Sequence, residues 1–263
     1  MIVEQIEKIG RSTLYYLHDI GRMGVFLLLA FRGVAKPPFR FFALIKEIRL
    51  IGVNSLVVIF FTAAFTGMVL GLQGYYSLSK FGSEGFLGSA VALSLIRELG
   101  PVLTALMVTG RAGSAMCAEL GIMRISEQID ALECMAIDPF RYIIAPKFLA
   151  TLISVPLLTL LFNVVGIYGG YLAGVKLLGV NPGAYFSSME KSVLNQDINL
   201  SIIKSIVFAL IIVWVCAGRG YYVQEIRGAG YGAESVSHVT TQAVVVASIS
   251  ILIWTYLLTA VLL

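Results

Sequence analysis

Long apolar stretches separated by short polar segments dominate this sequence. Residues 50–79 and 148–175 run for 30 and 28 positions without a charged side chain, and Val239–Leu263 adds 25 more. A helix needs about 20 apolar residues to cross a bilayer. The pattern therefore predicts an all-α integral membrane protein.

We expect about five transmembrane helices, at residues 50–78, 86–110, 147–176, 204–218 and 239–263. The fourth is short for a bilayer, so we expect it to borrow length from Ile198–Ile203, with Lys204 reaching outward.

The first 49 residues differ from the rest because basic and apolar side chains are mixed there. They hold eight of the 19 Lys and Arg residues, and Pro37–Pro38 interrupts them. Helices in the membrane interface have this composition, since long basic side chains reach the headgroups. A solvated arm is the alternative. We predict an elbow of interfacial helices at 1–49, followed by a transmembrane domain at 50–263.

Basic residues are distributed unevenly between the two sides of the predicted spans. With the N-terminus inside, 14 Lys and Arg fall on the inner side and four on the outer side, while Arg97 lies within a span. Inner segments of membrane proteins carry this excess. The N-terminus is therefore expected in the cytoplasm and the C-terminus outside.

Composition and missing motifs narrow the possible functions. Hydrophobic residues make up 58% of the chain and charged residues only 13%, and the three cysteines are isolated. Neither a metal site nor a cofactor is indicated. The phosphate-binding P-loop, HExxH and GxSxG are absent, so the chain has no catalytic centre of these kinds. Nothing points to a nucleic-acid partner, and ATP used by such a protein has to be bound by another subunit.

An acid and a base stand side by side within the second span, at Arg97 and Glu98. Charges there cost a few kcal/mol each and need a compensating role. Pro101 cannot donate a hydrogen bond to the carbonyl of Arg97, so we expect a kinked or broken helix that frees backbone groups. Adjacent residues project about 100° apart and cannot face one partner squarely. An interhelical ion pair and a role in substrate handling are both open.

A second polar constellation lies in the cytoplasmic stretch 119–146. Ser126 is expected to cap a short helix, which Asp138–Pro139 ends. Acidic residues recur every third position there, beside an apolar strip that includes Leu132. Anionic lipid would repel this acidic face, so a docking surface for a cytosolic protein is favoured over a membrane-surface helix. The docking candidates are Glu127, Gln128, Asp130, Leu132 and Glu133.

Small residues recur at four-residue spacing in three places and allow close helix approach. Packing within one chain and contact between two copies are both compatible with these rows. They are Ala63/Gly67/Gly71, Gly110/Ser114/Ala118 and Gly166/Gly170/Gly174.

Several long motifs occur in a fixed order. They read LIRELGP at 95–101, GRAGSAMCAELGIMR at 110–124, EQIDALE at 127–133 and DPFR at 138–141. Together with the glycine-rich third span and TTQAVV at 240–245, they closely resemble the MlaE (YrbE) family over nearly everything from residue 50. Members of that family are permease subunits of ABC transporters that work with MCE proteins.

The resemblance implies a permease that moves phospholipid between the inner membrane and an MCE-protein conduit and so maintains outer-membrane lipid asymmetry. Implied partners are a second permease copy, a cytosolic ABC ATPase, a periplasmic MCE hexamer and a small cytosolic STAS-type subunit. The permease would lie in the bacterial inner membrane with its C-terminus in the periplasm. Its coupling helix would fall at 126–136. Arg97, Glu98 and Pro101 would border the lipid cavity between the two copies.

The chain departs from the family pattern near its C-terminus. His238 and Gln242 stand where relatives often carry basic residues beside the Thr-Thr pair. Two other functions remain as alternatives: an ion-coupled secondary carrier that uses Arg97 and Glu98, and a membrane anchor of an envelope assembly without transport.

Overall fold

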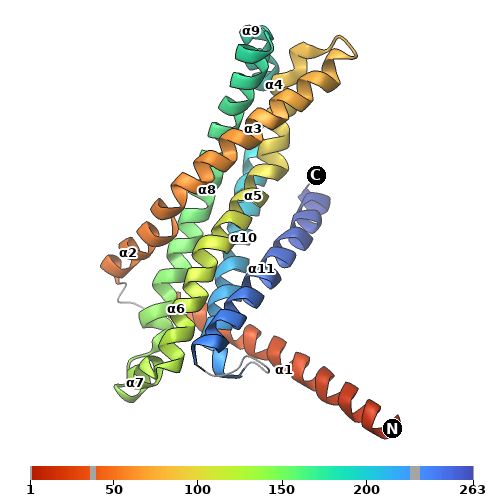
Figure 1. Cartoon of the computed structure of the whole chain (residues 1–263). Helices are drawn as coiled ribbons and strands as arrows, with labels where there is room; N and C mark the ends of the chain where they lie inside the picture. Colours follow the sequence, from red (N-terminus) through yellow and green to blue (C-terminus); the bar gives the residue numbers. More distant parts are fainter. Residues whose placement is uncertain (1, 36–39, 226–231, 263) are drawn as a thin grey trace.

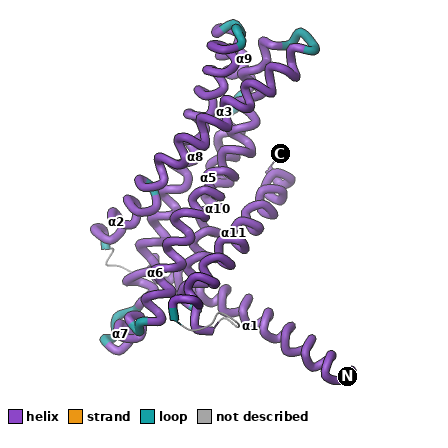
Figure 2. The backbone as a smooth tube through the Cα atoms, viewed as in Figure 1, coloured by secondary structure: helices purple, strands orange, loops and turns teal. Residues whose placement is uncertain are grey.

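The computed structural model describes residues 2–35, 40–225 and 232–262. Within these ranges every regular element is helical, with loops mainly at the two ends of the bundle (Figure 2). The prediction of an all-α membrane protein is confirmed.

The α-helices are α1 Ile2–Ala35, α2 Phe41–Ile51, α3 Leu56–Ser79, α4 Leu87–Ser94, α5 Gly100–Val108, α6 Ser114–Ile125, α7 Gln128–Cys134, α8 Ala145–Tyr171, α9 Pro182–Ser192, α10 Asn195–Tyr221 and α11 Ala233–Leu262. Short 3-10 helices are η1 Val53–Ser55, η2 Glu84–Phe86 and η7 Val223–Glu225. Four π-helical segments are η3 Leu95–Leu99, η4 Thr109–Gly113, η5 Phe140–Ile144 and η6 Leu172–Leu177.

Five helical segments are long and apolar enough to span a membrane, as predicted. They cover Phe41–Ser79, Glu84–Ile125, Phe140–Leu177, Asn195–Tyr221 and Ala233–Leu262. Most are longer than the uncharged runs. The second, for example, continues past the expected end at Gly110, because the Arg111 side chain reaches across to the backbone of Leu50 and so does not end the helix.

The fourth span does borrow length at its start, because α10 begins at Asn195. The expectation that Lys204 reaches outward is wrong. Its side chain is completely buried. It lies nine residues into the helix, about 14 Å from the beginning, at a rise of 1.5 Å per residue.

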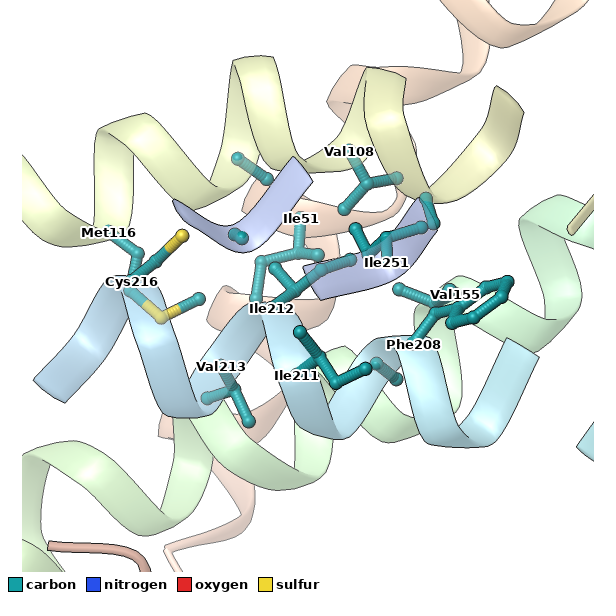
Figure 3. Packing of buried hydrophobic residues seen from close by; sticks show 14 of the residues in the cluster. Ile51, Val108, Met116, Val155, Phe208, Ile211, Ile212, Val213, Cys216 and Ile251 are labelled. Atoms are coloured by element: carbon teal, nitrogen blue, oxygen red, sulfur yellow. The ribbon is translucent and has the colours of Figure 1, made fainter. Parts of the chain in front are cut away.

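The core surrounds α10, the most buried of the five spans, whereas α11 is the least buried. Helices α5, α6, α8 and α11 all pack on α10. Figure 3 shows Phe208, Ile212 and Cys216 of α10 beside Val108 of α5 and Val155 of α8. This central helix therefore brings residues from several spans together.

Two of the small-residue rows bring α3 and α8 into close contact within one chain. A Cβ atom on Gly67 would lie 1.8 Å from the carbonyl oxygen of Gly166, and one on Gly71 would lie 2.8 Å from that of Gly170. Backbones this close require glycine. Gly110, in the third row, is exposed with nothing within 4 Å of its added Cβ, so that row leaves a free face.

Residues 2–35 of the N-terminal segment form a single helix, α1. Helix α1 projects obliquely from one end of the bundle (Figure 1). Its last turns pack on α10 through Phe26, whose ring lies 5.9 Å from that of Tyr221, and on α8 through Phe31, whose ring lies 5.1 Å from that of Phe148. Leu14, Leu17 and Ile20, further out, are exposed and apolar. The expected Pro37–Pro38 break lies outside the described residues.

The two ends of the bundle carry different small helices. Helix α7 lies at one end and α9 at the opposite end (Figure 1). Helix α7, which connects the second and third spans, is therefore separated by the length of the bundle from α9, which connects the third and fourth spans.

Candidate functional site

A π-helical turn, η3, interrupts the second span directly before Pro101. Such turns often occur at functional sites. Proline leaves the carbonyl of Arg97 without its usual helical partner. Lys204 Nζ of α10 donates a hydrogen bond to that oxygen at 2.8 Å. The sequence correctly predicted an irregular helix with a freed carbonyl, and a buried ammonium group occupies it.

Arg97 is paired with an aspartate of α10. Its Nε donates to Asp197 Oδ1 at 2.7 Å, and the Asp197 side chain is only 5% exposed. The second carboxylate oxygen, Oδ2, accepts from the backbone N–H of Leu194 at 3.0 Å, at the beginning of α10. Both oxygens of this buried carboxylate thus have donors, as a buried charge requires.

Glu98 is held by a second set of partners. Its Oε1 accepts from Lys204 Nζ at 2.7 Å and lies 2.8 Å from Thr259 Oγ1 of α11. The Lys204 ammonium also donates to Thr259 Oγ1 at 2.7 Å. All three donor positions of this buried ammonium are therefore used, and the contacts join the second, fourth and fifth spans.

The four charges sum to zero, which offsets the cost of placing them in the membrane. The interhelical ion pairing that the sequence left open is present, because Arg97 and Glu98 each pair with a residue of α10. The sequence did not predict these partners, because Lys204 was expected to reach outward and Asp197 precedes the expected start of the fourth span. Their spacing of seven residues, two turns on one helix face, was the available signal.

The Arg97 guanidinium nevertheless keeps binding capacity. Its side chain is 34% exposed, and among the described residues only its Nε has a partner. Both Nη atoms remain able to donate, and a guanidinium can bind a phosphate through two parallel hydrogen bonds. We call Arg97, Glu98, Asp197, Lys204 and Thr259 the mid-span network.

Pro101, the third cavity candidate, is buried, so it shapes the helix rather than presenting a surface. Beside it, Gly100 lies against Asn163 of α8. A Cβ at position 100 would come within 1.9 Å of Asn163 Oδ1. Asn163 Nδ2 donates to Ser201 Oγ at 3.2 Å. These contacts fix the position of η3 between α8 and α10.

The five residues proposed for docking differ in their surroundings. Glu127 and Gln128 are exposed. Asp130 accepts from Arg124 Nη1 at 2.6 Å, and Glu133 accepts from the Tyr221 hydroxyl at 3.4 Å. Leu132 is partly buried. Part of the acidic face is thus used within the chain, and Glu127 and Gln128 are its freest members.

The local geometry corrects two details of this helix. It spans Gln128–Cys134 rather than 126–136, because Glu127 and Ala136 have φ of 58° and 57°, which ends a helix on either side. Ser126 does not cap it. The Ser126 hydroxyl donates to the carbonyl of Ile122 at 2.7 Å, at the end of α6.

Outside the spans, Asp138 Oδ1 accepts from the backbone N–H of Phe140 at 3.0 Å, where the third span begins. His238 is exposed and Gln242 is partly buried on α11. Within the described ranges, no group of three or more His, Cys, Asp or Glu residues could hold a metal ion.

Fold and site together define a multi-pass, all-α membrane protein with a neutral ionic network joining three of its spans. The chain belongs to the MlaE permease family, because the family model described as Permease MlaE matches residues 44–261.

Similar proteins span bacteria and a plant. The chain is 44% identical to the intermembrane phospholipid transport system permease protein MlaE of Haemophilus influenzae, covering 99% of this chain and 98% of that protein. It is 40% identical to a probable ABC transporter permease protein of Rickettsia bellii, covering 98% of each. It is 33% identical to TRIGALACTOSYLDIACYLGLYCEROL 1 of Arabidopsis thaliana, covering 82% of this chain and 60% of that protein.

Proposed function

We propose that this chain is the permease subunit of an ATP-driven transporter that moves phospholipids between the inner membrane and an MCE-protein conduit. Near-full-length similarity to the Haemophilus phospholipid transport permease supports the substrate. Similarity to proteins named ABC transporter permeases supports the energy source. In this account a separate cytosolic ATPase binds and hydrolyses ATP, and the chain itself is not an enzyme.

The lipid-handling role is supported by the hydrogen bonding of the Arg97 guanidinium. One edge of its guanidinium is fixed by Asp197, while both Nη atoms are left with no partner among the described residues. The arginine is therefore pre-oriented, and binding a phosphate through its free nitrogens costs little side-chain entropy. The Glu98–Lys204 pair beside it keeps the surrounding charge neutral.

Helix α7 is the proposed docking element for the ATPase. Glu127, directly before the helix, and Gln128, its first residue, are exposed. Helix α7 lies at one end of the bundle, between the second and third spans (Figure 1). This end faces the cytoplasm in the proposed orientation, in which α9 and the C-terminus lie on the periplasmic side. There the permease would meet the MCE hexamer, and a small STAS-type subunit belongs to the cytosolic side.

A second permease copy completes the proposed assembly. Helices α3 and α11 are poorly buried in the single chain, and both expose apolar side chains such as Phe65 and Ile253. Two copies that meet through these spans would enclose a lipid cavity bordered by the mid-span network.

The alternative functions are not favoured. Asp197 and Glu98, the carboxylates available to an ion-coupled carrier, each form an ion pair within the chain that joins two spans. Similarity to ABC transporter permeases also argues against a passive anchor.

The test is to purify the full chain from its native membranes, identify its partners and reconstitute the complex. We expect an ATPase to co-purify and ATP to drive movement of labelled phospholipid between liposomes and an acceptor. Absence of ATPase from a complex that still moves lipid, or no ATP dependence, would overturn the proposal.

A further inference from the structure

A cavity lined by both apolar and charged side chains lies apart from the mid-span network, near the α7 end of the second span. Its volume is about 330 Å³, and α2, η4, α6 and α8 form its walls. Glu47, Arg111, Glu119 and Lys147 contribute charges, while Leu50 and Met116 contribute apolar surface. We call it the inner cavity.

The acidic part of the inner cavity carries more negative than positive charge. Lys147 is only 2% exposed, and its Nζ donates to Glu47 Oε1 at 2.9 Å and to Glu119 Oε2 at 2.6 Å. One ammonium between two carboxylates leaves one negative charge in excess. The Glu119 side chain is 49% exposed, so this is the carboxylate that can meet a cation from outside.

The opposite part of the inner cavity is positive. Arg111 Nη1 donates to the carbonyl of Leu50 at 3.0 Å and to Ser55 Oγ at 3.1 Å. Its Nη2 and Nε have no partner among the described residues. The guanidinium is thus held by one nitrogen and presents the others, the arrangement that suits a phosphate.

Arg111 and Glu119 lie at different depths along the bundle. Helix α6 runs toward α7, so Glu119 lies nearer to the α7 end than Arg111 does. Eight helical residues separate them by about 12 Å, and the two long side chains shorten that gap. Arg111 therefore lies nearer to the middle of the bundle, and Glu119 nearer to its α7 end.

We propose that the inner cavity binds the headgroup of a zwitterionic aminophospholipid from the leaflet on the α7 side. The phosphate diester lies against Arg111 and the primary ammonium against Glu119, with the acyl chains directed toward the membrane interior. This order matches a lipid standing in that leaflet, whose ammonium group is nearest to the water. The inference rests on the proposed function for the phospholipid substrate and for the cytoplasmic side of α7.

The site gives the proposed transporter a headgroup preference. An anionic lipid without an amine satisfies Arg111 but supplies no cation for Glu119, which shares the Lys147 ammonium with Glu47. A neighbouring cavity of about 360 Å³ shares Glu47, Glu119 and Lys147 and adds Arg40 and Lys46 on its other wall. Arg40 and Lys46 attract anionic lipid, whereas Glu119 favours a lipid with an ammonium group. Comparing the binding of an aminophospholipid with that of an anionic phospholipid shows which attraction is stronger.

The experiment compares lipid binding by variants of the full chain with native mass spectrometry. The probes are phosphatidylethanolamine and phosphatidylglycerol with identical acyl chains. Glu119→Gln keeps a hydrogen-bond acceptor for Lys147 but removes the excess charge, so it should lower the preference for phosphatidylethanolamine by about fivefold. Arg111→Gln should weaken both lipids alike. Glu234→Gln, an exposed glutamate at the beginning of α11, is the matched control.

A second measurement locates the bound lipid. A photoreactive amino acid at Leu50, which lines the inner cavity and is 42% exposed, should capture phosphatidylethanolamine. Capture of a second copy of the chain instead would make this cavity a subunit interface and overturn the proposal. An unchanged lipid preference in Glu119→Gln would overturn it as well. In either case ATP-driven transport that still depends on Arg97 would leave the proposed function standing.

Discussion

Individual residues in the second span explain why charges are tolerated inside the membrane. Arg97 and Glu98 point to different partners, Asp197 and Lys204, because adjacent helical positions face different directions. The sequence revealed the two central charges and the proline beside them. It did not reveal their partners, because pairing across 100 or more residues depends on how spans one to five are arranged.

Replacing Lys204 with methionine should destabilise the protein by about 3 kcal/mol, since it leaves Glu98 and the carbonyl of Arg97 without their buried donor. The double variant Lys204→Met/Glu98→Gln should regain part of this loss, because no unpaired carboxylate remains. Unfolding of the detergent-solubilised protein measures both. A double variant less stable than the single one would contradict the pairing.

Tyr185 in α9 gives a pH-dependent prediction. Burial raises the pKa of its phenol well above the ordinary value, and the hydroxyl donates to the carbonyl of Ile167 at 3.0 Å. A raised pKa contributes stability that is complete below about pH 10, the unfolded value, and is lost as the pH rises further.

Tyr185→Phe should therefore cost about 1 kcal/mol at neutral pH, for the lost hydrogen bond. The difference from the parent should shrink as the pH rises above about 10. Unfolding measured at pH 7 and in alkaline buffer tests this. A difference that grows with pH would show that the phenol is not held in its neutral form.

At the scale of helices, hydrophobicity predicted how many spans there are better than where they end. Uncharged runs marked the interior of each span, but Arg111 and Lys147 lie within helices because each is bound by acceptors from a neighbouring helix. The small helix α7 is shorter than predicted. Its ends are set by the left-handed backbone at Glu127 and Ala136, which side-chain pattern does not reveal.

Reversing the charge of Glu127 tests the docking role of α7. Glu127→Lys should reduce the amount of ATPase recovered with the permease several-fold while leaving permease yield unchanged, because this exposed side chain has no partner in the described chain. Asp130→Lys is less informative alone, since it also breaks the pair with Arg124. Glu234→Lys, another exposed acidic residue, is the control. Normal ATPase recovery with Glu127→Lys would count against docking through this residue.

At the scale of the whole molecule, the first and fifth spans are the two least buried of the five in the single chain. Their exposed apolar side chains are available for contact with a second copy. Single cysteines at Phe65 of α3 and Ile253 of α11 should each form cross-linked dimers in native membranes. The exposed Cys134 is first replaced by serine, and the buried Cys117 and Cys216 are kept. Val164 of α8, which is at least as exposed, serves as the comparison. Only monomers at both positions would rule out a dimer through these helices.

The central claim, that the mid-span network handles phospholipid, is tested most directly by ATP-driven lipid transport with Arg97→Lys. Lysine keeps the positive charge for Asp197 but loses the fork that binds a phosphate, so transport should fall at least tenfold while assembly with the ATPase persists. Arg49→Lys, the same change at an exposed arginine, should transport normally. If Arg97→Lys assembles and transports as well as the parent, the network is only a structural bridge between spans and the account is wrong.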